Sequence, residues 1–139
     1  MRFVKMFPWN RPLTNIDINN IISKTPLQNV FRGTFSRDEL ELINPREGVE
    51  AGVINLSRSH ENGTHWTAWF KHPRGYSHPR GYICYFDSYG DLPPPPEFIS
   101  YISNYDIYYN VEREQEFNTV ICGQLCISFL LKEYSGNFI

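Results

Sequence analysis

Four residues have the side-chain types that thiol-protease chemistry requires: His65, Asp87, Gln115 and Cys122. A cysteine thiolate attacks a carbonyl carbon, a histidine takes the thiol proton and later protonates the leaving amine, and an aspartate orients the imidazole. A glutamine amide can donate a hydrogen bond to the developing oxyanion. In the chain the order is His, Asp, Gln, Cys, so the candidate nucleophile comes last.

Cys122 is followed by Gly123 and by an apolar run with helical spacing, which predicts a helix that begins at the cysteine. Free backbone N–H groups and the helix dipole at such a position lower a thiol pKa. Gly123 places no side chain in the path of a substrate. The alternative is a buried core cysteine, which is the usual environment of a lone Cys.

His65 precedes an aromatic run and Asp87 ends an apolar one, so both are expected at strand ends. The alternatives are a strand histidine bonded to a backbone carbonyl, and an aspartate that starts the turn at 88–91. Three other histidines are expected in solvated loops: His60, His72 and His78.

Gln115 lies seven residues before Cys122, where its amide can meet an oxyanion beside the Cys122 backbone N–H. The alternative is a solvated loop glutamine, because most of the residues at 112–116 are charged.

A metal site is a competing interpretation of some of these residues. His72, His78 and Cys84 recur every six residues, and Cys122 and Cys126 are one helical turn apart. No CxxC or HExxH motif accompanies them, and a flexible loop holds a metal poorly. The sequence therefore predicts no metal and no cofactor.

Composition sets the class of protein. A chain of 139 residues, 41% hydrophobic and 20% charged, is expected to form one domain, residues 1–139. An odd number of cysteines, three, favours reduced thiols and an intracellular setting. The net charge of −2 gives no global basic field for nucleic acid. No apolar run reaches about 18 residues, so no membrane span is expected.

Hydrophobic periodicity and turn residues predict an α+β fold, with a small mixed β-sheet packed against helices. Thr14 and Asp17 resemble a capping box at the start of the first helix. The expected helices cover 14–25, 97–104 and 122–136, the expected strands cover 52–56, 64–71, 82–87 and 107–111, and 28–46 is expected to be mainly loop with short elements.

A direct duplication separates two of the expected strands. The sequence HPRGY occurs at 72–76 and again at 78–82. Two copies do not make a repeat architecture, so the duplication is interpreted as a lengthened hairpin loop. Lys71, Arg74 and Arg80 would form its basic cluster.

Together and in this order, these residues resemble the adenovirus protease (adenain) family of cysteine endopeptidases and the related SUMO- and ubiquitin-like-protein-specific proteases. Adenovirus enzymes usually carry glutamate where this chain has Asp87. The resemblance covers about residues 13–132, and the segments that carry it are 31–36, 52–55, 63–69, 85–90 and 115–126.

The resemblance implies a single cysteine protease domain with a papain-like core and the roles given above for the four site residues. It also implies a substrate channel formed with Gly63, Trp66 and Gly123, which Trp66 narrows to small residues such as glycine. The chain is most similar to the short enzymes of adintoviruses and Polinton/Maverick elements. The implied substrates are capsid or other structural precursors, cleaved in the host nucleus or cytoplasm and in the virion.

Two departures from the family pattern keep alternatives open. The chain is short, and it is slightly acidic, whereas the adenovirus enzyme is basic and uses DNA as a cofactor. DNA activation and activation by a partner-derived peptide therefore both stay open. Two other functions are a deconjugating protease for ubiquitin-like proteins, and a catalytically silent binding module of the same fold.

Overall fold

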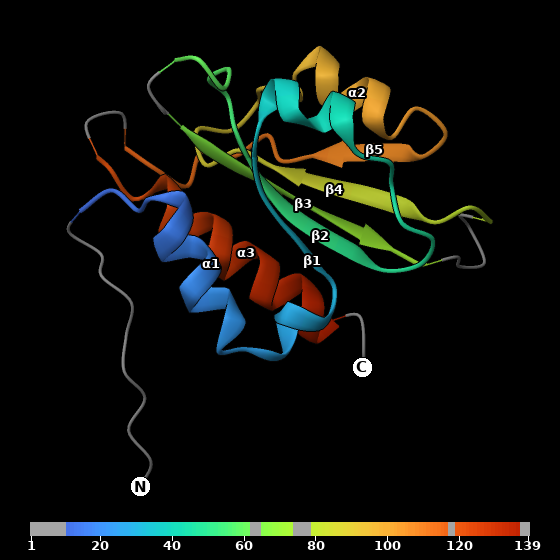
Figure 1. Ribbon diagram of the computed structural model, residues 1–139, viewed down its shortest axis with the longest axis horizontal. Coiled ribbons are helices and arrows are strands. Elements are labelled where there is room, and N and C mark those ends of the chain that lie inside the picture. The colour runs from blue at the N-terminus through green and yellow to red at the C-terminus, as the bar shows by residue number, and fades with distance from the viewer. Residues whose placement is uncertain (1–10, 62–64, 74–78, 117–118, 137–139) are drawn as a thin grey trace, which may run out of the picture.

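The structure is a computed structural model that describes residues 11–61, 65–73, 79–116 and 119–136. A five-stranded mixed sheet lies between two layers of helices (Figure 1). The predicted α+β class and the small mixed sheet are confirmed. Within the described segments, no helix is both long enough and apolar enough to cross a lipid bilayer.

The sheet has the spatial order β1-β2-β3-β4-β5. The outer pairs β1–β2 and β4–β5 are parallel, whereas β2–β3 and β3–β4 are antiparallel. β3 is the central strand of the sheet, and helices cover both of its faces. All of its residues except Trp66 are buried. The strands are β1 Phe31–Ser36, β2 Glu50–Asn55, β3 Trp66–His72, β4 Tyr82–Phe86 and β5 Asp106–Tyr109.

Two sets of helices cover the two faces of the sheet. The α-helices α1 (Asn15–Ser23) and α3 (Cys122–Gly136) lie on one face with the 3-10 helix η1 (Pro26–Asn29) (Figure 1). The 3-10 helix η2 (Arg37–Leu42) and the α-helix α2 (Pro96–Tyr101) lie on the other.

Alternation along β3 divides the apolar residues into two cores. Ala68 and Phe70 belong to the core under α1 and α3, whereas Trp69 points to the opposite face and belongs to the core under η2 and α2. The sheet thus separates two hydrophobic cores, and the helix that begins at Cys122 packs on only one of them.

The predicted capping box of α1 is confirmed. The Thr14 side chain accepts a hydrogen bond from the Asp17 backbone N–H at 3.1 Å, and Asp17 Oδ2 accepts one from the Thr14 N–H at 2.9 Å. This pair of bonds fixes where the helix starts. It therefore also fixes Leu13, the residue before the cap, which is buried.

The first strand was not predicted. The segment 28–46 was expected to be mainly loop, but it contains β1, which pairs in parallel with β2. All six β1 residues are half-buried, so the strand has no alternation of polar and apolar positions. Gly33 has a positive φ of 132°, and the register shifts between Phe31 and Thr34, which interrupts the pattern further.

Some predicted boundaries also differ. The strand expected at 64–71 begins at Trp66 and continues to His72, although position 64 lies outside the described residues. The helix expected to reach 104 ends at Tyr101, and the strand expected at 107–111 is β5, Asp106–Tyr109.

Two residues at the start of the duplicated loop are buried in the sheet. Lys71 is buried, donates a hydrogen bond to the Arg46 carbonyl and lies 4.8 Å above the centre of the Tyr105 ring. His72 is also buried, so its predicted solvation is wrong. Arg80 is exposed, whereas Arg74 and His78 lie outside the described residues.

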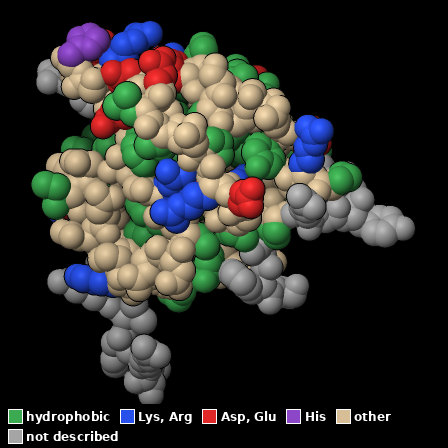
Figure 2. All heavy atoms as spheres, turned by 45° about the vertical axis from the view of Figure 1, so that its right-hand side comes forward, with side chains coloured by type: hydrophobic (Ala, Val, Ile, Leu, Met, Phe, Trp, Pro, Cys, Tyr) green, Lys and Arg blue, Asp and Glu red, His purple; other side chains and the backbone are tan. Residues whose placement is uncertain are grey.

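The expected basic cluster therefore does not form as predicted, because Lys71 points into the protein. On the face drawn in Figure 2, the described Lys and Arg side chains lie in separate groups among neutral and acidic residues. This face shows no continuous basic field, in agreement with the net charge of −2.

Gly52 in β2 gives the first prediction. A Cβ atom there would lie 2.1 Å from Cη2 of Trp69, which is fully buried and donates from Nε1 to Glu50 Oε1 at 3.1 Å. Because the indole cannot move without losing that bond, Gly52→Ala should lower the free energy of unfolding by about 3 kcal/mol or more. Urea denaturation of the purified variant measures this loss.

Gly136→Ala is the matched control. No atom lies within 4 Å of the added Cβ, so its unfolding free energy should stay equal or rise by up to about 1 kcal/mol. Equal urea midpoints for the two variants would show that Trp69 is free to move aside.

Candidate active site

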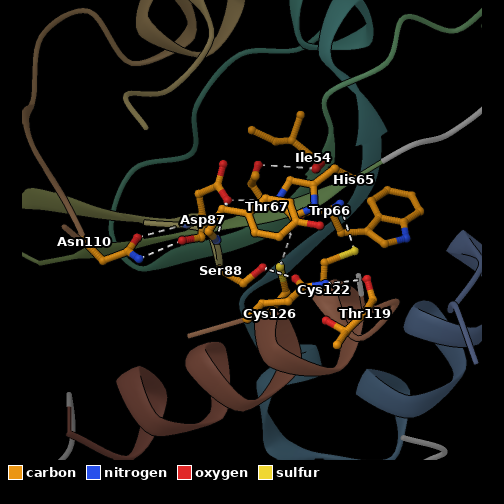
Figure 3. Close-up of polar contacts among 12 residues, drawn as sticks. Ile54, His65, Trp66, Thr67, Asp87, Ser88, Asn110, Thr119, Cys122 and Cys126 are labelled. Atoms are coloured by element: carbon orange, nitrogen blue, oxygen red, sulfur yellow. Dashed lines mark hydrogen bonds and ion pairs between the residues drawn. The ribbon is translucent and has the colours of Figure 1, made fainter. Parts of the chain in front are cut away.

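The Cys122 thiol lies where α3 meets the start of β3. Cys122 is the first residue of α3, as predicted. Its Sγ accepts the Trp66 backbone N–H at 3.5 Å (Figure 3). The His65 imidazole and the Gly123 backbone also act to lower the pKa of this thiol. The surroundings of the sulfur therefore favour its negatively charged form.

His65 lies between the cysteine and a carboxylate. Its Nε2 is 2.8 Å from Asp87 Oδ1, and the two side chains are 11% and 2% exposed. Because Nε2 faces Asp87, Nδ1 is the ring nitrogen left for the Cys122 thiol. The Tyr89 ring stacks on the imidazole at 4.6 Å between ring centres. The structure thus brings together the predicted nucleophile, base and orienting acid.

The pKa values of the pair shift in opposite directions. Burial alone lowers the pKa of His65, but hydrogen bonds and charge from Asp87 and Cys122 outweigh it and raise the pKa to about 9. Burial alone raises the pKa of the Cys122 thiol, but His65 and the Trp66 N–H outweigh it and lower the pKa. At a pH above the pKa of Cys122 and below that of His65, an imidazolium facing a thiolate is therefore the favoured protonation state.

This ion pair also gives the site a defined dependence on pH. The stability that protonated His65 contributes is complete below the unfolded histidine pKa of about 6.5. It is lost as the pH rises through the folded value of about 9.

Asp87 is held by its own turn and by the neighbouring strand. Its Oδ1 also accepts the Tyr89 backbone N–H at 2.9 Å, and Gly90 follows with a φ of 75°. Asn110, directly after β5, donates from Nδ2 to the Asp87 carbonyl at 2.7 Å and accepts the Asp87 N–H at 2.9 Å. The aspartate therefore starts a turn and faces the imidazole at the same time, so the two sequence interpretations are compatible.

Gln115 is buried, which excludes the solvated-loop interpretation. Its Oε1 accepts a hydrogen bond from the Ser88 hydroxyl, and its Nε2 donates to the Thr119 carbonyl at 2.9 Å. Its backbone N–H donates to the Ser88 carbonyl. A primary amide has two N–H groups. The oxyanion role of Gln115 stays a prediction, and the second N–H is the one it requires.

The three predicted substrate-binding residues have different outcomes. Trp66 lies beside Cys122 and donates from Nε1 to the Leu13 carbonyl at 2.8 Å. A Cβ added at Gly123 would lie 3.1 Å from Leu13 Cβ and 3.3 Å from the Trp66 ring. A larger residue there would therefore fit tightly against Leu13 and Trp66, and the contact of Gly123 with a substrate stays a prediction. Gly63 lies outside the described residues.

A cleft of about 460 Å³ opens beside the thiol. Its lining comes from the segment at 12–15 that leads into α1, from the end of β1 and from the loop after β2. Cys122 and Trp66 also line it, so a peptide in the cleft would lie beside the thiol. The remaining lining is mostly polar: Thr14, Asn15, Thr34, Ser36, Glu39, Asn55, Ser57, Arg58 and Glu61.

Sequence reasoning missed three residues that hold this geometry: Ser88, Tyr89 and Asn110. Asn110 carried a usable signal, because an asparagine directly after an aromatic β-run often ends a strand. Ser88 and Tyr89 carried none, since both are ordinary turn residues in sequence. Their roles arise from partners more than twenty positions away, His65 and Gln115.

The two metal-binding alternatives from the sequence have different outcomes in the structure. Cys122 and Cys126 bind the two backbone groups of one residue: Cys122 accepts the Trp66 N–H, and the Cys126 thiol donates to the Trp66 carbonyl at 3.3 Å. His72 and Cys84 do come together, but the third residue beside them is Glu133 of α3.

No known protein-family model matches this chain, and no curated protein has significant sequence similarity to it. The chemical interpretation therefore depends on the geometry and the motifs described above.

The pH dependence of alkylation tests the ion pair. Iodoacetamide should modify Cys122 first, with a midpoint below the pKa of about 8.5 of an ordinary cysteine. Cys84 and Cys126 should react far more slowly, because burial raises the pKa of Cys84 to about 12 and that of Cys126 well above its usual value. Mass spectrometry of digests across a pH series gives all three rates.

His65→Ala removes the charge that opposes burial, so the Cys122 midpoint should move to higher pH. His60→Ala, at an exposed histidine, is the matched control and should leave it unchanged. An unaltered midpoint in His65→Ala would exclude the ion pair as the cause of thiol reactivity.

Proposed function

We propose that this protein is a cysteine endopeptidase that cleaves peptide bonds through a thioester intermediate. The observation that supports this most is the His65 imidazole, which lies 2.8 Å from Asp87 and lowers the pKa of the Cys122 thiol at the start of α3. A buried structural cysteine has no need of an imidazole whose pKa is raised and whose far nitrogen faces a carboxylate.

In the proposed reaction, the Cys122 thiolate attacks the scissile carbonyl carbon and the carbonyl π electrons move onto oxygen. The backbone N–H of Cys122 and the Gln115 amide donate hydrogen bonds to this oxyanion. Protonated His65 then gives its proton to the amide nitrogen, the C–N bond breaks and the amine leaves.

The acyl group is then held as a thioester on Cys122. Neutral His65 takes a proton from a water molecule, which attacks the thioester carbon. Collapse of the second tetrahedral intermediate breaks the C–S bond and releases the carboxylic acid. The thiolate and the imidazolium are thereby regenerated, with Asp87 keeping the ring oriented throughout.

The finer fold assignment belongs to the same proposal. We assign a papain-like core of adenain type, in which base and acid come from adjacent antiparallel strands and the nucleophile begins a helix packed on them. The support is the order His65, Asp87, Gln115, Cys122, together with β3 and β4 as neighbours and α3 across them. Such cores usually place the cysteine first, so this order is the more specific feature.

The proposed substrates are precursor proteins with small residues at the cleavage site, such as the capsid or other structural proteins of a virus or mobile element. The Trp66 ring is fixed by its bond to the Leu13 carbonyl and lies beside the thiol, which leaves a bulky side chain little space. DNA or a partner peptide as activator is not required by this chemistry.

Cleavage of a peptide library provides the main test. The protein should cut peptides with glycine next to the scissile bond more readily than matched peptides with leucine or phenylalanine there. Mass spectrometry of the products gives the new termini. Cys122→Ala should abolish cleavage while the far-ultraviolet circular dichroism spectrum stays unchanged, because the alanine removes only the nucleophile.

Three outcomes would contradict the proposal in different ways. Cleavage by Cys122→Ala would exclude the nucleophile, and equal turnover of glycine and leucine peptides would exclude the narrow channel. Absence of peptide cleavage together with reaction of Cys122 with an electrophilic ubiquitin-like protein would favour a deconjugating enzyme.

Gln115→Ala tests the oxyanion donor. Loss of one such donor costs about 100- to 1000-fold in kcat in other enzymes, and KM should change little because the bond forms mainly in the transition state. Steady-state kinetics on the best library peptide measures both constants.

The control is Ser88→Ala, which removes only the hydroxyl that bonds to Gln115 Oε1 and should have a smaller effect on kcat. The iodoacetamide rate of Cys122 should be unchanged in both variants, since alkylation creates no oxyanion. A near-normal kcat in Gln115→Ala would give the glutamine a purely structural role.

A further inference from the structure

Three side chains with metal-binding atoms converge at the opposite end of β3 from the thiol. They are His72 at the end of β3, Cys84 in β4 and Glu133 in the last turns of α3. Their potential ligand atoms all lie within 4.8 Å of one another. Since Cys122 and Glu133 are eleven positions apart on one helix, this cluster is about 16 Å along the helix axis from the nucleophile.

Two aromatic rings hold the His72 imidazole in place, but its Nε2 atom lacks a hydrogen bond. The Tyr82 ring stacks on it at 4.6 Å with 17° between the planes, and the Phe70 ring lies at 4.9 Å. The Nε2 atom is buried and lies 3.4 Å from Glu133 Oε2, within ion-pair distance but without the geometry of a hydrogen bond. A buried imidazole nitrogen without a bond costs free energy that a ligand on it would recover.

The two other groups are directed at the same point. The Cys84 sulfur lies within 4.8 Å of a Glu133 carboxylate oxygen, and both residues are half-buried. Cys84 pairs with Phe70, which packs under α3, so its side chain points to that face of the sheet. His72 is two residues after Phe70 on β3, so its side chain points to the same face. The ligand atoms therefore come from three separate elements of the fold.

From this geometry we propose that His72 Nε2, Cys84 Sγ and a Glu133 carboxylate oxygen bind one Zn²⁺ ion, with water in the fourth position. Imidazole, thiolate and carboxylate are all zinc ligands, at about 2.0 to 2.3 Å from the metal. Tetrahedral ligands at those distances are roughly 3.3 to 3.8 Å apart, so the three groups need to approach by only about 1 Å.

Binding of Zn²⁺ releases one proton. Zn²⁺ forms a bond to Cys84 Sγ as the thiol proton leaves for solvent, and Cys84 and Glu133 then bind the same metal ion. The ion would join the end of α3 to the two central strands of the sheet. Its effect on the protein is therefore structural: it stabilises the helix whose other end carries the nucleophile.

The test uses Co²⁺ and Zn²⁺ on the full chain in a Cys122→Ser background, which removes the catalytic thiol as a ligand. One equivalent of Co²⁺ should give the near-ultraviolet charge-transfer band of a cobalt–thiolate bond. One equivalent of Zn²⁺ should abolish the band, release one proton and raise the melting temperature above that in EDTA.

Substitutions of the three proposed ligands test whether these side chains bind the metal. Cys84→Ser should remove the charge-transfer band, and His72→Gln and Glu133→Gln should each weaken Zn²⁺ binding by at least about 100-fold. The control His60→Gln, at an exposed histidine, should leave the Zn²⁺ affinity unchanged. Circular dichroism identifies any variant that fails to fold, and Glu133→Gln keeps the shape and hydrogen bonding of the native side chain.

The proposal is overturned if stoichiometric Co²⁺ gives no thiolate band, or if the band persists in Cys84→Ser. It is equally overturned if Zn²⁺ raises the melting temperature of the wild-type site and of Cys84→Ser to the same extent, which indicates adventitious binding. None of these readouts depends on peptide cleavage, so they do not bear on the proposed protease activity.

Discussion

The candidate site depends on how α3 is docked onto the peptide groups of one residue, Trp66. The Cys122 sulfur accepts the Trp66 N–H, and the Cys126 thiol, one turn later in the helix, donates to the Trp66 carbonyl. These two bonds set the rotation and height of the helix relative to β3. Since His65 directly precedes Trp66, the same docking places the imidazole against the Cys122 sulfur. Gly123 suits this docking, because a side chain there would press against Leu13 and the Trp66 ring.

The sequence predicted those features that are encoded locally. The α1 capping box, the start of α3 at Cys122 and the aromatic strands β3 and β4 all have short-range signals, and each is present. The proximity of His65, Asp87 and Cys122 was also predictable, because strand ends and a helix start are natural meeting points for such side chains. Their roles were predictable only as a set, since each alone has a common structural explanation.

Features that depend on distant partners were not predictable. β1 was missed because it is half-buried along its whole length and therefore lacks periodicity. His72 begins the duplication and was expected in a solvated loop, and the preceding Lys71 was expected in a basic cluster, but tertiary packing buries both. The same error hid the cluster with Glu133, whose position more than sixty residues from His72 gives no spacing pattern to detect. Gln115 had the charged neighbours of a solvated loop, and only its bonds to Ser88 and Thr119 reveal its burial.

The contact between the segment before α1 and the start of α3 has a consequence for the order of assembly. The Gln124 amide donates to the Arg11 carbonyl across 113 positions of sequence, and the Leu13 carbonyl accepts the Trp66 indole N–H. Contacts this distant in sequence form late, because the chain must close a long loop to make them. His65 and Asp87 can meet on the hairpin of β3 and β4 well before Cys122 arrives. A partly folded chain would then hold the His65–Asp87 pair without Cys122 beside it, so the three side chains come together only when α3 docks.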